Sequence, residues 1–366
     1  MKHPGFICFL FLLLSQIGLS QEWETMYLSF LDPDAKESSG LIILEGKGIT
    51  HNDSGNDPTL FEIDLTSGNI LRSVSIRNGT NVDWEDICRD EHHLFIADFG
   101  NNQGTRTDLR VLKIEIDSFL HKDTVRAEFI YFGFKDQDSF SPAPFETNYD
   151  AEALVSYRDS LFIFTKQWGN FKTRIYPLSK EPGEYSISAI DSLDTNFMVT
   201  GADVNESSNL LGIVGYNFSR AFFLPLPADV LRDGFSSTFD VFPLETSGSM
   251  QVEALAFDKM GTGYFTSESN AIGDAGLYSL KRTVSRQPMT DQRQFIRVYP
   301  NPSSDRIYFD NLVFNIVTLT SPLGRVVEKS NYTSSLNVSH LEPGFYFITF
   351  YDENLRVIFK QILLRQ

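Results

Sequence analysis

The chain has 366 residues and a formal net charge of −17 at pH 7, from 31 Lys and Arg against 48 Asp and Glu. One Lys lies in residues 1–20, and seven basic and six acidic side chains lie from Arg297 onward, so residues 21–296 hold 23 basic and 42 acidic side chains. A segment this acidic repels phosphate, so we expect no nucleic acid among its partners; its charge suits cations or plain solubility.

The N-terminus has the pattern of a secretory signal peptide. A short basic head at 1–3 precedes a nearly unbroken apolar run at 6–14, and Gly18-Leu19-Ser20 offers a small-residue cleavage site. We therefore predict that 1–20 are removed on export and that the mature chain begins at Gln21. No other segment reaches about 18 apolar residues, so we expect no transmembrane segment.

Residues 21–290 contain a repeat of short strands separated by turn residues, and no long segment has the helical period. Each of five units opens with a five-residue segment that ends in an aliphatic residue, and a second apolar strand follows. The opening segments are 37–41, 83–87, 150–154, 200–204 and 251–255, and the second strands are 48–52, 94–98, 161–165, 211–215 and 263–267. Such units recur every 45 to 67 residues or so, which is typical of a β-propeller, and we predict an all-β fold.

The repeat predicts five blades, and six blades are the alternative. Five units can be counted, and the fifth lacks an obvious fourth strand. Residues 24–30 would supply that strand and close the ring. The stretch 134–149 contains two prolines and several polar residues, and we interpret it as a protruding loop. If that stretch hides more strands, the propeller has six blades.

Equivalent positions of a rotationally repeated fold lie on a ring, and here they are mostly acidic. Carboxylates crowded around one axis favour calcium or magnesium. The predicted ligands of a calcium ion are Asp53, Glu85, Asp98, Glu152 and Glu253. The predicted ligand-binding residues of the channel mouth are His51, Asn52, Asp86, Lys166, Asp203 and Glu268.

Two other roles fit the same residues. Carboxylates on inner strands can accept hydrogen bonds from the backbone of the next blade and so fix the ring, which suits Glu152 and Glu253. A carboxylate that holds a proton can instead act as a general acid or base. The sequence contains no GxSxG, HExxH, Walker or EF-hand pattern. It therefore identifies no catalytic residue and leaves open whether the protein is an enzyme.

The chain changes character from Val298. Short alternating strands carry Y-P-N-P at 299–302, S-P-L-G-R at 321–325 and L-E-P-G-F-Y at 341–346. These motifs resemble the type A C-terminal sorting domain of type IX secretion cargo from Bacteroidetes. The resemblance implies that 298–366 form a small β-sandwich sorting domain that binds the type IX secretion machinery. It also implies export to the cell surface or the extracellular space.

A second resemblance covers about 37–282. The order of ESSGL, HNDSGN, DWEDI, IADFGNN, DLRVLKIE, YDAEALV, FTK, VEALAF and TSE is similar to that in a family of exported bacterial propellers. More distantly, these units resemble SdiA-regulated and esterase-like phytase propellers. Phytase sites combine calcium-binding acids with several basic side chains, whereas this chain offers Lys166, with Arg106 and Arg110 nearby in sequence.

Two functions follow as expectations. The first is a secreted or cell-surface propeller, monomeric, that binds an extracellular ligand or an ion at its channel mouth. The second is a calcium-dependent hydrolase, similar to phytases and other phosphatases or to lactonases, that uses the acids of the channel.

Overall fold

The structure is a computed structural model. It describes residues 20–217, 220–235, 239–246, 251–270, 273–285, 297–310, 314–321, 325–331, 333–351 and 357–365. The expected signal peptide lies outside these residues except for Ser20, as do residues 322–324 of the S-P-L-G-R motif. The chain divides into two compact units, a larger one of Trp23–Arg282 and a smaller one that contains Thr283–Gln366.

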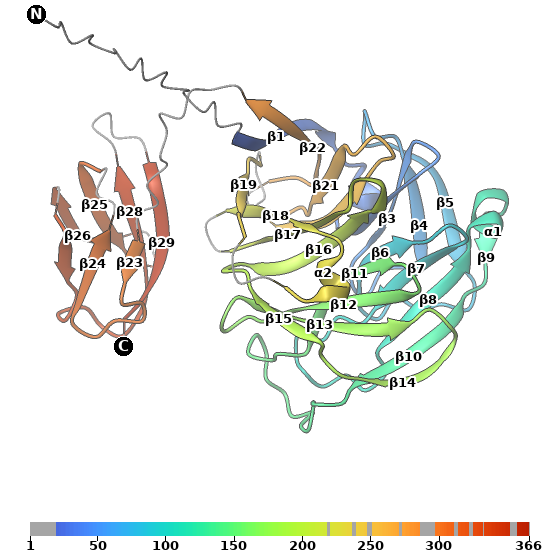
Figure 1. The fold of residues 1–366 in the computed structure, drawn as a ribbon, viewed down its shortest axis with the longest axis horizontal. Helices are drawn as coiled ribbons and strands as arrows, with labels where there is room; N and C mark the ends of the chain where they lie inside the picture. The colour runs from blue at the N-terminus through green and yellow to red at the C-terminus, as the bar shows by residue number, and fades with distance from the viewer. Residues whose placement is uncertain are drawn as a thin grey trace, which may run out of the picture. The chain divides into compact units, whose positions relative to one another are not determined.

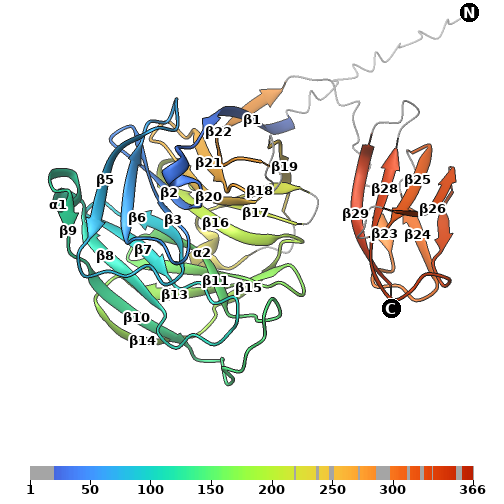
Figure 2. The same ribbon diagram turned by 180° about the vertical axis from the view of Figure 1, so that it is seen from behind.

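Five sheets make up the described part of the larger unit (Figures 1 and 2). The first has the order β2 (Ser38–Leu44), β3 (Lys47–Asn52), β4 (Thr59–Ile63), β5 (Ile70–Ile76) and β9 (Thr124–Val125). The second has the order β6 (Trp84–Arg89), β7 (His93–Asp98), β8 (Arg110–Glu115), β10 (Glu128–Phe134) and β14 (Gly183–Ile187). The third has the order β11 (Asp150–Tyr157), β12 (Ser160–Lys166), β13 (Lys172–Ser179) and β15 (Asp191–Asp194).

The last two sheets of this unit each have four strands. The fourth sheet has the order β16 (Met198–Asn205), β17 (Leu210–Tyr216), β18 (Ala221–Pro227) and β19 (Phe242–Leu244). The fifth has the order β20 (Val252–Phe257), β21 (Gly263–Ser267), β22 (Gly276–Ser285) and β1 (Ser20–Phe30). The N-terminal strand thus supplies the fourth strand of the last sheet, in the place expected for residues 24–30.

The inner and outer strands differ in sequence because they differ in burial. The inner strand β20 is buried at all six positions and reads as a continuous small and apolar run around Glu253. The outer strand β10 alternates between exposed and buried positions, as expected for a strand with one face in water. In both ribbon views β5, β10 and β14 lie at the edge of the unit, whereas β6, β11 and β16 lie further inside.

The inner strands contact each other in the cyclic order β2, β6, β11, β16, β20 and back to β2. An apolar cluster fills each of the five interfaces between neighbouring sheets. One example is the cluster between the second and third sheets, where Phe95, Leu154 and Tyr176 pack together with the thiol-bearing Cys88. Burial of these apolar faces is the main favourable term for a fold of this kind.

Two short parallel pairings join neighbouring sheets. After β8 the chain forms α1 (Ile116–His121) and then β9, which pairs parallel with β5 of the preceding sheet. Strand β14 follows β13 but pairs parallel with β10. Residues 135–149, all of which the structure describes, contain no strand, as expected for a protruding loop. The second helix, α2 (Val230–Asp233), is a single turn.

The smaller unit contains two sheets that share one apolar core around Ile307, Val317 and Phe350. The first has the order β23 (Arg297–Tyr299), β24 (Arg306–Asp310) and β27 (Ser335–Asn337). The second has the order β26 (Val326–Asn331), β25 (Ile316–Thr320), β28 (Gly344–Tyr351) and β29 (Val357–Arg365). This two-sheet arrangement agrees with the small β-sandwich expected from Val298 onward.

Candidate functional site

A β-bulge occurs at the same place in all five sheets of the larger unit. In each sheet the register between the first and second strand shifts by one residue near the start of the first strand. The extra residues are Ser39, Glu85, Glu152, Thr200 and Glu253. A bulge leaves its extra residue outside the ladder and turns the side chain in a new direction. The five bulges are therefore the equivalent positions from which the candidate site is built.

Two of the bulge residues bond the backbone of the neighbouring sheet. The Ser39 hydroxyl donates to the carbonyl of Glu85 at 2.9 Å, and the Thr200 hydroxyl donates to the carbonyl of Val252. The other three bulge residues are acidic: Glu152 and Glu253 lie near Lys166, at the end of β12, and Glu85 lies near Glu152. We call this group of side chains and the acids around it the acidic mouth. Its members are Asp53, Asp83, Glu85, Asp150, Glu152, Glu253, Glu268 and Lys166.

A buried ion pair lies within the acidic mouth. The Nζ atom of Lys166 lies 3.1 Å from Oε1 of Glu152, and both side chains are buried. The ammonium also lies 4.6 Å from the ring centroid of Trp168 and 5.5 Å from that of Tyr216. Burial alone lowers the pKa of Lys166, but the carboxylate of Glu152 and its neighbours hold it well above the usual value. Lys166 is therefore charged at neutral pH.

The carboxylates repel one another. Burial, then the charges of neighbouring acids, raises the pKa of Asp83 to about 7 and that of Glu268 to about 9. Burial also raises the pKa of Glu253 to about 7, although Lys166 acts in the opposite direction. The pKa of Glu85 is raised well above its usual value by burial and by Glu152. The acidic mouth therefore stays partly protonated near neutral pH unless a cation enters it.

Three acids of the mouth form a compact group. One carboxylate oxygen from each of Asp53, Asp83 and Glu85 lies within 4.8 Å of the other two. Gly100 borders this group, since a Cβ atom there would overlap Oε1 of Glu85 and would lie 2.5 Å from Oδ2 of Asp83. No larger residue fits at Gly100 without displacing the two carboxylates.

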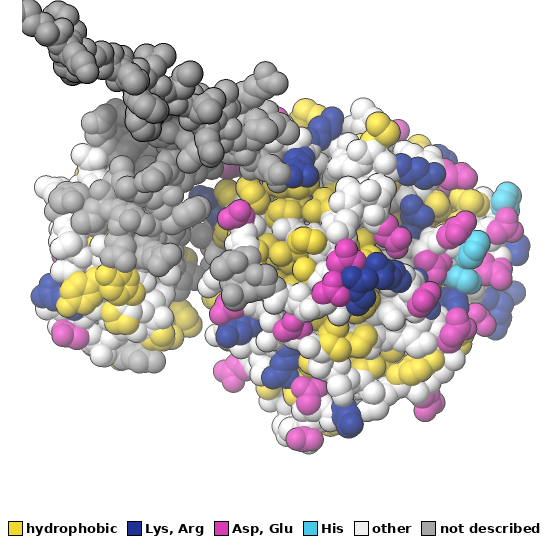
Figure 3. Space-filling view, in the orientation of Figure 1, with side chains coloured by type: hydrophobic (Ala, Val, Ile, Leu, Met, Phe, Trp, Pro, Cys, Tyr) yellow, Lys and Arg dark blue, Asp and Glu magenta, His cyan; other side chains and the backbone are white. Residues whose placement is uncertain are grey.

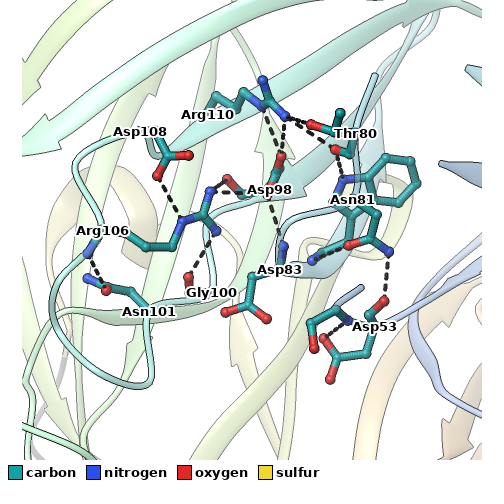
Figure 4. Close-up of polar contacts among 12 residues, drawn as sticks. Asp53, Thr80, Asn81, Asp83, Asp98, Gly100, Asn101, Arg106, Asp108 and Arg110 are labelled. Atoms are coloured by element: carbon teal, nitrogen blue, oxygen red, sulfur yellow. Dashed lines mark hydrogen bonds and ion pairs between the residues drawn. The ribbon is translucent and has the colours of Figure 1, made fainter. Parts of the chain in front are cut away.

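Asp98 is buried on the other side of Asp83 and is bound to two arginines (Figure 4). The guanidinium of Arg110 lies 2.7 Å from Oδ2 of Asp98, and that of Arg106 lies 3.2 Å from Oδ1. Figure 4 shows the carboxylate of Asp83 pointing away from Asp98. Asp98 is therefore held in an ion-pair network, and the structure does not bring it together with Asp53 and Glu85.

Asp86 and Asp203 hold neighbouring sheets together. Asp86 accepts hydrogen bonds from the N–H groups of Ile87 and of Leu154 in the third sheet, both at 2.8 Å. Asp203 accepts from Val204 at 2.8 Å and from Phe257 in the fifth sheet at 2.7 Å. Inner-strand acids therefore do accept hydrogen bonds from the backbone of the next sheet, as expected. The residues that do so are Asp86 and Asp203, whereas the prediction named Glu152 and Glu253.

Asp203 was predicted at the mouth because residues 200–204 were aligned with the opening segments of the other units. The bulges show that Thr200 is the residue equivalent to Glu85 and Glu253. Asp203 lies three residues further along β16. Residues 200–204 were therefore aligned two residues out of register. The side chain of Asp203 is partly buried and binds the backbone of β16 and of β20.

His51 and Asn52 also serve the fold. His51 is fully buried, packs edge-on against Trp84, and shares a 3.1 Å contact between its Nδ1 atom and the carbonyl of Asn52. Burial lowers the pKa of His51 to about 4. The amide of Asn52 donates to the carbonyl of Asp34 at 2.8 Å and accepts from the N–H of Glu37 at 3.2 Å. Both side chains therefore stabilise the first sheet and the segment before it, and they do not belong to the acidic mouth.

Sequence reasoning missed several residues of the mouth. Asp83 and Asp150 are the first residues of two opening segments, two positions before a bulge, and this shared position was the signal that could have found them. Asp150 accepts from the indole Nε1 of Trp168 at 2.8 Å and from the N–H of Asn101 at 2.8 Å. Phe145 of the loop at 135–149 contacts Trp168 edge-on, with 4.9 Å between centroids.

The distribution of charge on the surface of the larger unit differs from that in the acidic mouth. In Figure 3 acidic and basic side chains are interspersed over the visible face. The described helices include none that is long and apolar enough to cross a membrane.

Comparison with known proteins identifies the smaller unit. Residues 297–365 match the model of the secretion system C-terminal sorting domain. The protein is exported. The sorting domain directs it to the cell surface or the extracellular space, and implies an interaction with the type IX secretion machinery. This confirms the prediction made from the Y-P-N-P and L-E-P-G-F-Y motifs.

Several solved structures have some likeness to this chain. The RRP9 WD40 repeats are 7% identical, with 71% of this chain and 100% of that chain covered and a TM-score of 0.40. The U3-55K structure is 7% identical, with 70% and 98% covered and a TM-score of 0.38. Hydrazine synthase of Kuenenia stuttgartiensis is 10% identical, with 90% and 96% covered and a TM-score of 0.35. No curated protein matches the exported chain.

Proposed function

We propose that this exported chain is a binding module: a closed five-bladed β-propeller over residues 21–290, with 298–366 as its sorting domain, that binds a positively charged ligand at the acidic mouth. The cyclic contacts of the inner strands support the closed ring, as does the pairing of β1 with β22. The order of the sequence motifs, which is similar to that in a family of exported bacterial propellers, also supports this architecture.

One observation carries the binding function. Four different sheets bring seven carboxylates to one place, where the described residues provide a single ammonium group, that of Lys166. The residual negative charge raises the pKa of several of these acids, and a bound cation would relieve the repulsion. The ligand is therefore a metal ion or a basic organic group, and calcium is the expected ion.

The test is a thermal melt of the full mature chain with two probes, calcium chloride and spermidine, at constant ionic strength set with sodium chloride. We expect at least one probe to raise the Tm of the natural protein. The variant with Glu253→Gln and Glu268→Gln should respond less to spermidine. A control with Glu128→Gln and Glu184→Gln removes two exposed acids from the outer strands β10 and β14. If neither probe raises the Tm, or if the mouth variant responds like the natural protein, the proposal is wrong.

A hydrolase is the second candidate, favoured by one observation. Burial raises the pKa values of Asp83 and Glu253 to about 7, which suits general acid–base catalysis at neutral pH. The test is an assay on p-nitrophenyl phosphate and on a simple lactone, with and without calcium. Activity that is lost in both Asp83→Asn and Glu253→Gln would establish hydrolysis, and its absence in the natural protein would leave binding alone.

Export has its own test. Deletion of 297–365 removes the sorting domain, and the truncated protein should accumulate in the periplasm, where fractionation and an antibody to the larger unit would detect it. Normal surface display of the truncated protein would contradict the role of this domain.

A further inference from the structure

In the described part of the chain, Asp53, Asp83 and Glu85 form a group of three acids whose carboxylates converge. Asp53 follows β3 of the first sheet, Asp83 immediately precedes β6 of the second sheet, and Glu85 lies within β6. Their nearest oxygens lie within 4.8 Å of one another. Calcium binds oxygen at about 2.3–2.6 Å, so ligands on opposite sides of one ion are about 5 Å apart. We propose that these three carboxylates bind one calcium ion, an assignment that rests on the proposed function.

Glu85 gives an independent reason to expect a ligand here. Glu85 is only 5% exposed, and burial together with the neighbouring acids raises the pKa of its carboxyl well above the usual value. A carboxylate that is this buried and lies beside other acids is costly to keep charged unless a cation neutralises it. A cation between Glu85, Asp53 and Asp83 would offset this cost at all three carboxylates.

The backbone keeps the space for the ion open. The N–H of Gly100 donates to the carbonyl of Asp83 at 3.1 Å, and its carbonyl accepts from Nη1 of Arg106 at 3.0 Å. These two bonds fix Gly100 against the carboxylates of Asp83 and Glu85. Because glycine has no Cβ, the backbone can approach this closely without filling the site.

The nearby basic side chains are bound elsewhere. Lys166 pairs with Glu152 at 3.1 Å, and Arg106 pairs with Asp98 and with Asp108. Within the described residues, no Lys or Arg forms an ion pair with any of the three proposed ligands. Arg106 and Lys166 act on Asp83 and Asp53 without an ion pair, so a cation from solution can still bind between the three carboxylates.

The ligand set suits calcium better than magnesium. Three carboxylates from a loop and a strand give an irregular arrangement, and the remaining positions are left to water or to oxygens of a ligand. Calcium accepts six to eight oxygens in flexible geometry, whereas magnesium requires near-ideal octahedral ligands and loses its water reluctantly. An extracellular site of this type is expected to have a Kd of about 10⁻⁴–10⁻³ M.

The test is isothermal titration of the full mature chain with calcium chloride, and with magnesium chloride for comparison. We expect one calcium ion per chain and weaker binding of magnesium. Asp83→Asn and Glu85→Gln should each weaken calcium binding at least tenfold. The matched control is Asp57→Asn, which changes an exposed acid on the loop that carries Asp53 and should leave the Kd unchanged. Melts without calcium verify that each variant folds.

The outcomes separate this site from the broader function. No calcium binding by the natural protein, or unchanged binding in Asp83→Asn and Glu85→Gln, would overturn the assignment. If spermidine still raises the Tm of the natural protein and does so less in the Glu253 and Glu268 variant, the acidic mouth binds organic cations and only the calcium site is wrong. If one variant does not fold, the other and Gly100→Ala, which fills the site without removing a charge, decide the question.

Discussion

The backbone N–H of Asp83 donates a hydrogen bond to Oδ1 of Asp98 at 3.1 Å, so two acids with different surroundings lie side by side. Asp98 is fully buried between two guanidinium groups. The carboxylate of Asp83 faces the acidic mouth, where Asp53 is its neighbour. The bond therefore joins the ion-pair network to the backbone of Asp83, whereas the carboxylate of Asp83 belongs to the proposed calcium site. Loss of charge should act differently at each of the two acids.

Asp98→Asn should destabilise the protein without changing calcium binding. The substitution leaves the guanidinium groups of Arg106 and Arg110 without their buried partner, and breaking a buried ion pair typically costs about 3–5 kcal/mol. Chemical denaturation measures the loss. Asp108→Asn is the control, because this acid pairs with the same Arg106 but is 60% exposed, and an exposed pair contributes about 0–1 kcal/mol. A similar loss from both variants would contradict the role of Asp98 as a buried partner.

The five-unit organisation could be predicted from sequence because the inner and outer strands have different patterns. Inner strands such as β11 are buried on both faces, and their E-A-L segments recur at a fixed place. The pairings of β9 and β14 could not be predicted, since strands of two and five residues that join a neighbouring sheet in parallel leave no local signal. Loop 135–149 was identified by its prolines and polar residues.

Part of the candidate site could also be predicted from the repeat. Glu85, Glu152 and Glu253 share the bulge position, which a repeat alignment detects. Asp86, Asp98 and Asp203 stabilise the fold instead. Their roles depend on which backbone N–H or guanidinium group each carboxylate contacts. These are contacts between distant segments, and spacing along the chain does not determine them.

Calcium should stabilise the natural protein, and Gly100→Ala should abolish the effect. A ligand at a hundred times its Kd stabilises the folded state by about 2.7 kcal/mol. The methyl group that this substitution adds would occupy the space beside Glu85 Oε1 and Asp83 Oδ2. Melts with and without calcium measure both values. Gly133→Ala is the control, because a Cβ at Gly133 meets nothing within 4 Å. A full calcium shift in Gly100→Ala would place the ion elsewhere.

Lys166→Met should be costly, and the cost should depend on pH. The substitution leaves the carboxylate of Glu152 buried without its partner, a loss of about 3–5 kcal/mol when the acid stays charged. The loss should shrink at lower pH, because burial already raises the pKa of Glu152 and the acid can then take up a proton.

A double-mutant cycle with Glu152→Gln tests this ion pair. The double variant should be less destabilised than the sum of the two single variants, because the two side chains contact each other directly. Additive losses, measured by denaturant unfolding at pH 8, would mean that Lys166 is stabilised chiefly by Glu253 and Asp150, its other acidic neighbours.

Asp203 should make the protein more stable in mild acid. Burial raises its pKa from 3.8 to about 7, so the folded protein keeps a proton that the unfolded chain releases between these values. The stability from this proton is fully present below about pH 4 and is lost as the pH rises through 7, at up to about 1.4 kcal/mol per pH unit. Asp203→Asn cannot ionise, so denaturant unfolding from pH 4 to 8 should show a flatter profile than the natural protein. The exposed Asp57→Asn should keep the natural profile. An unchanged slope in Asp203→Asn would mean that other groups, among them Asp86 and the acids of the mouth, set the pH dependence.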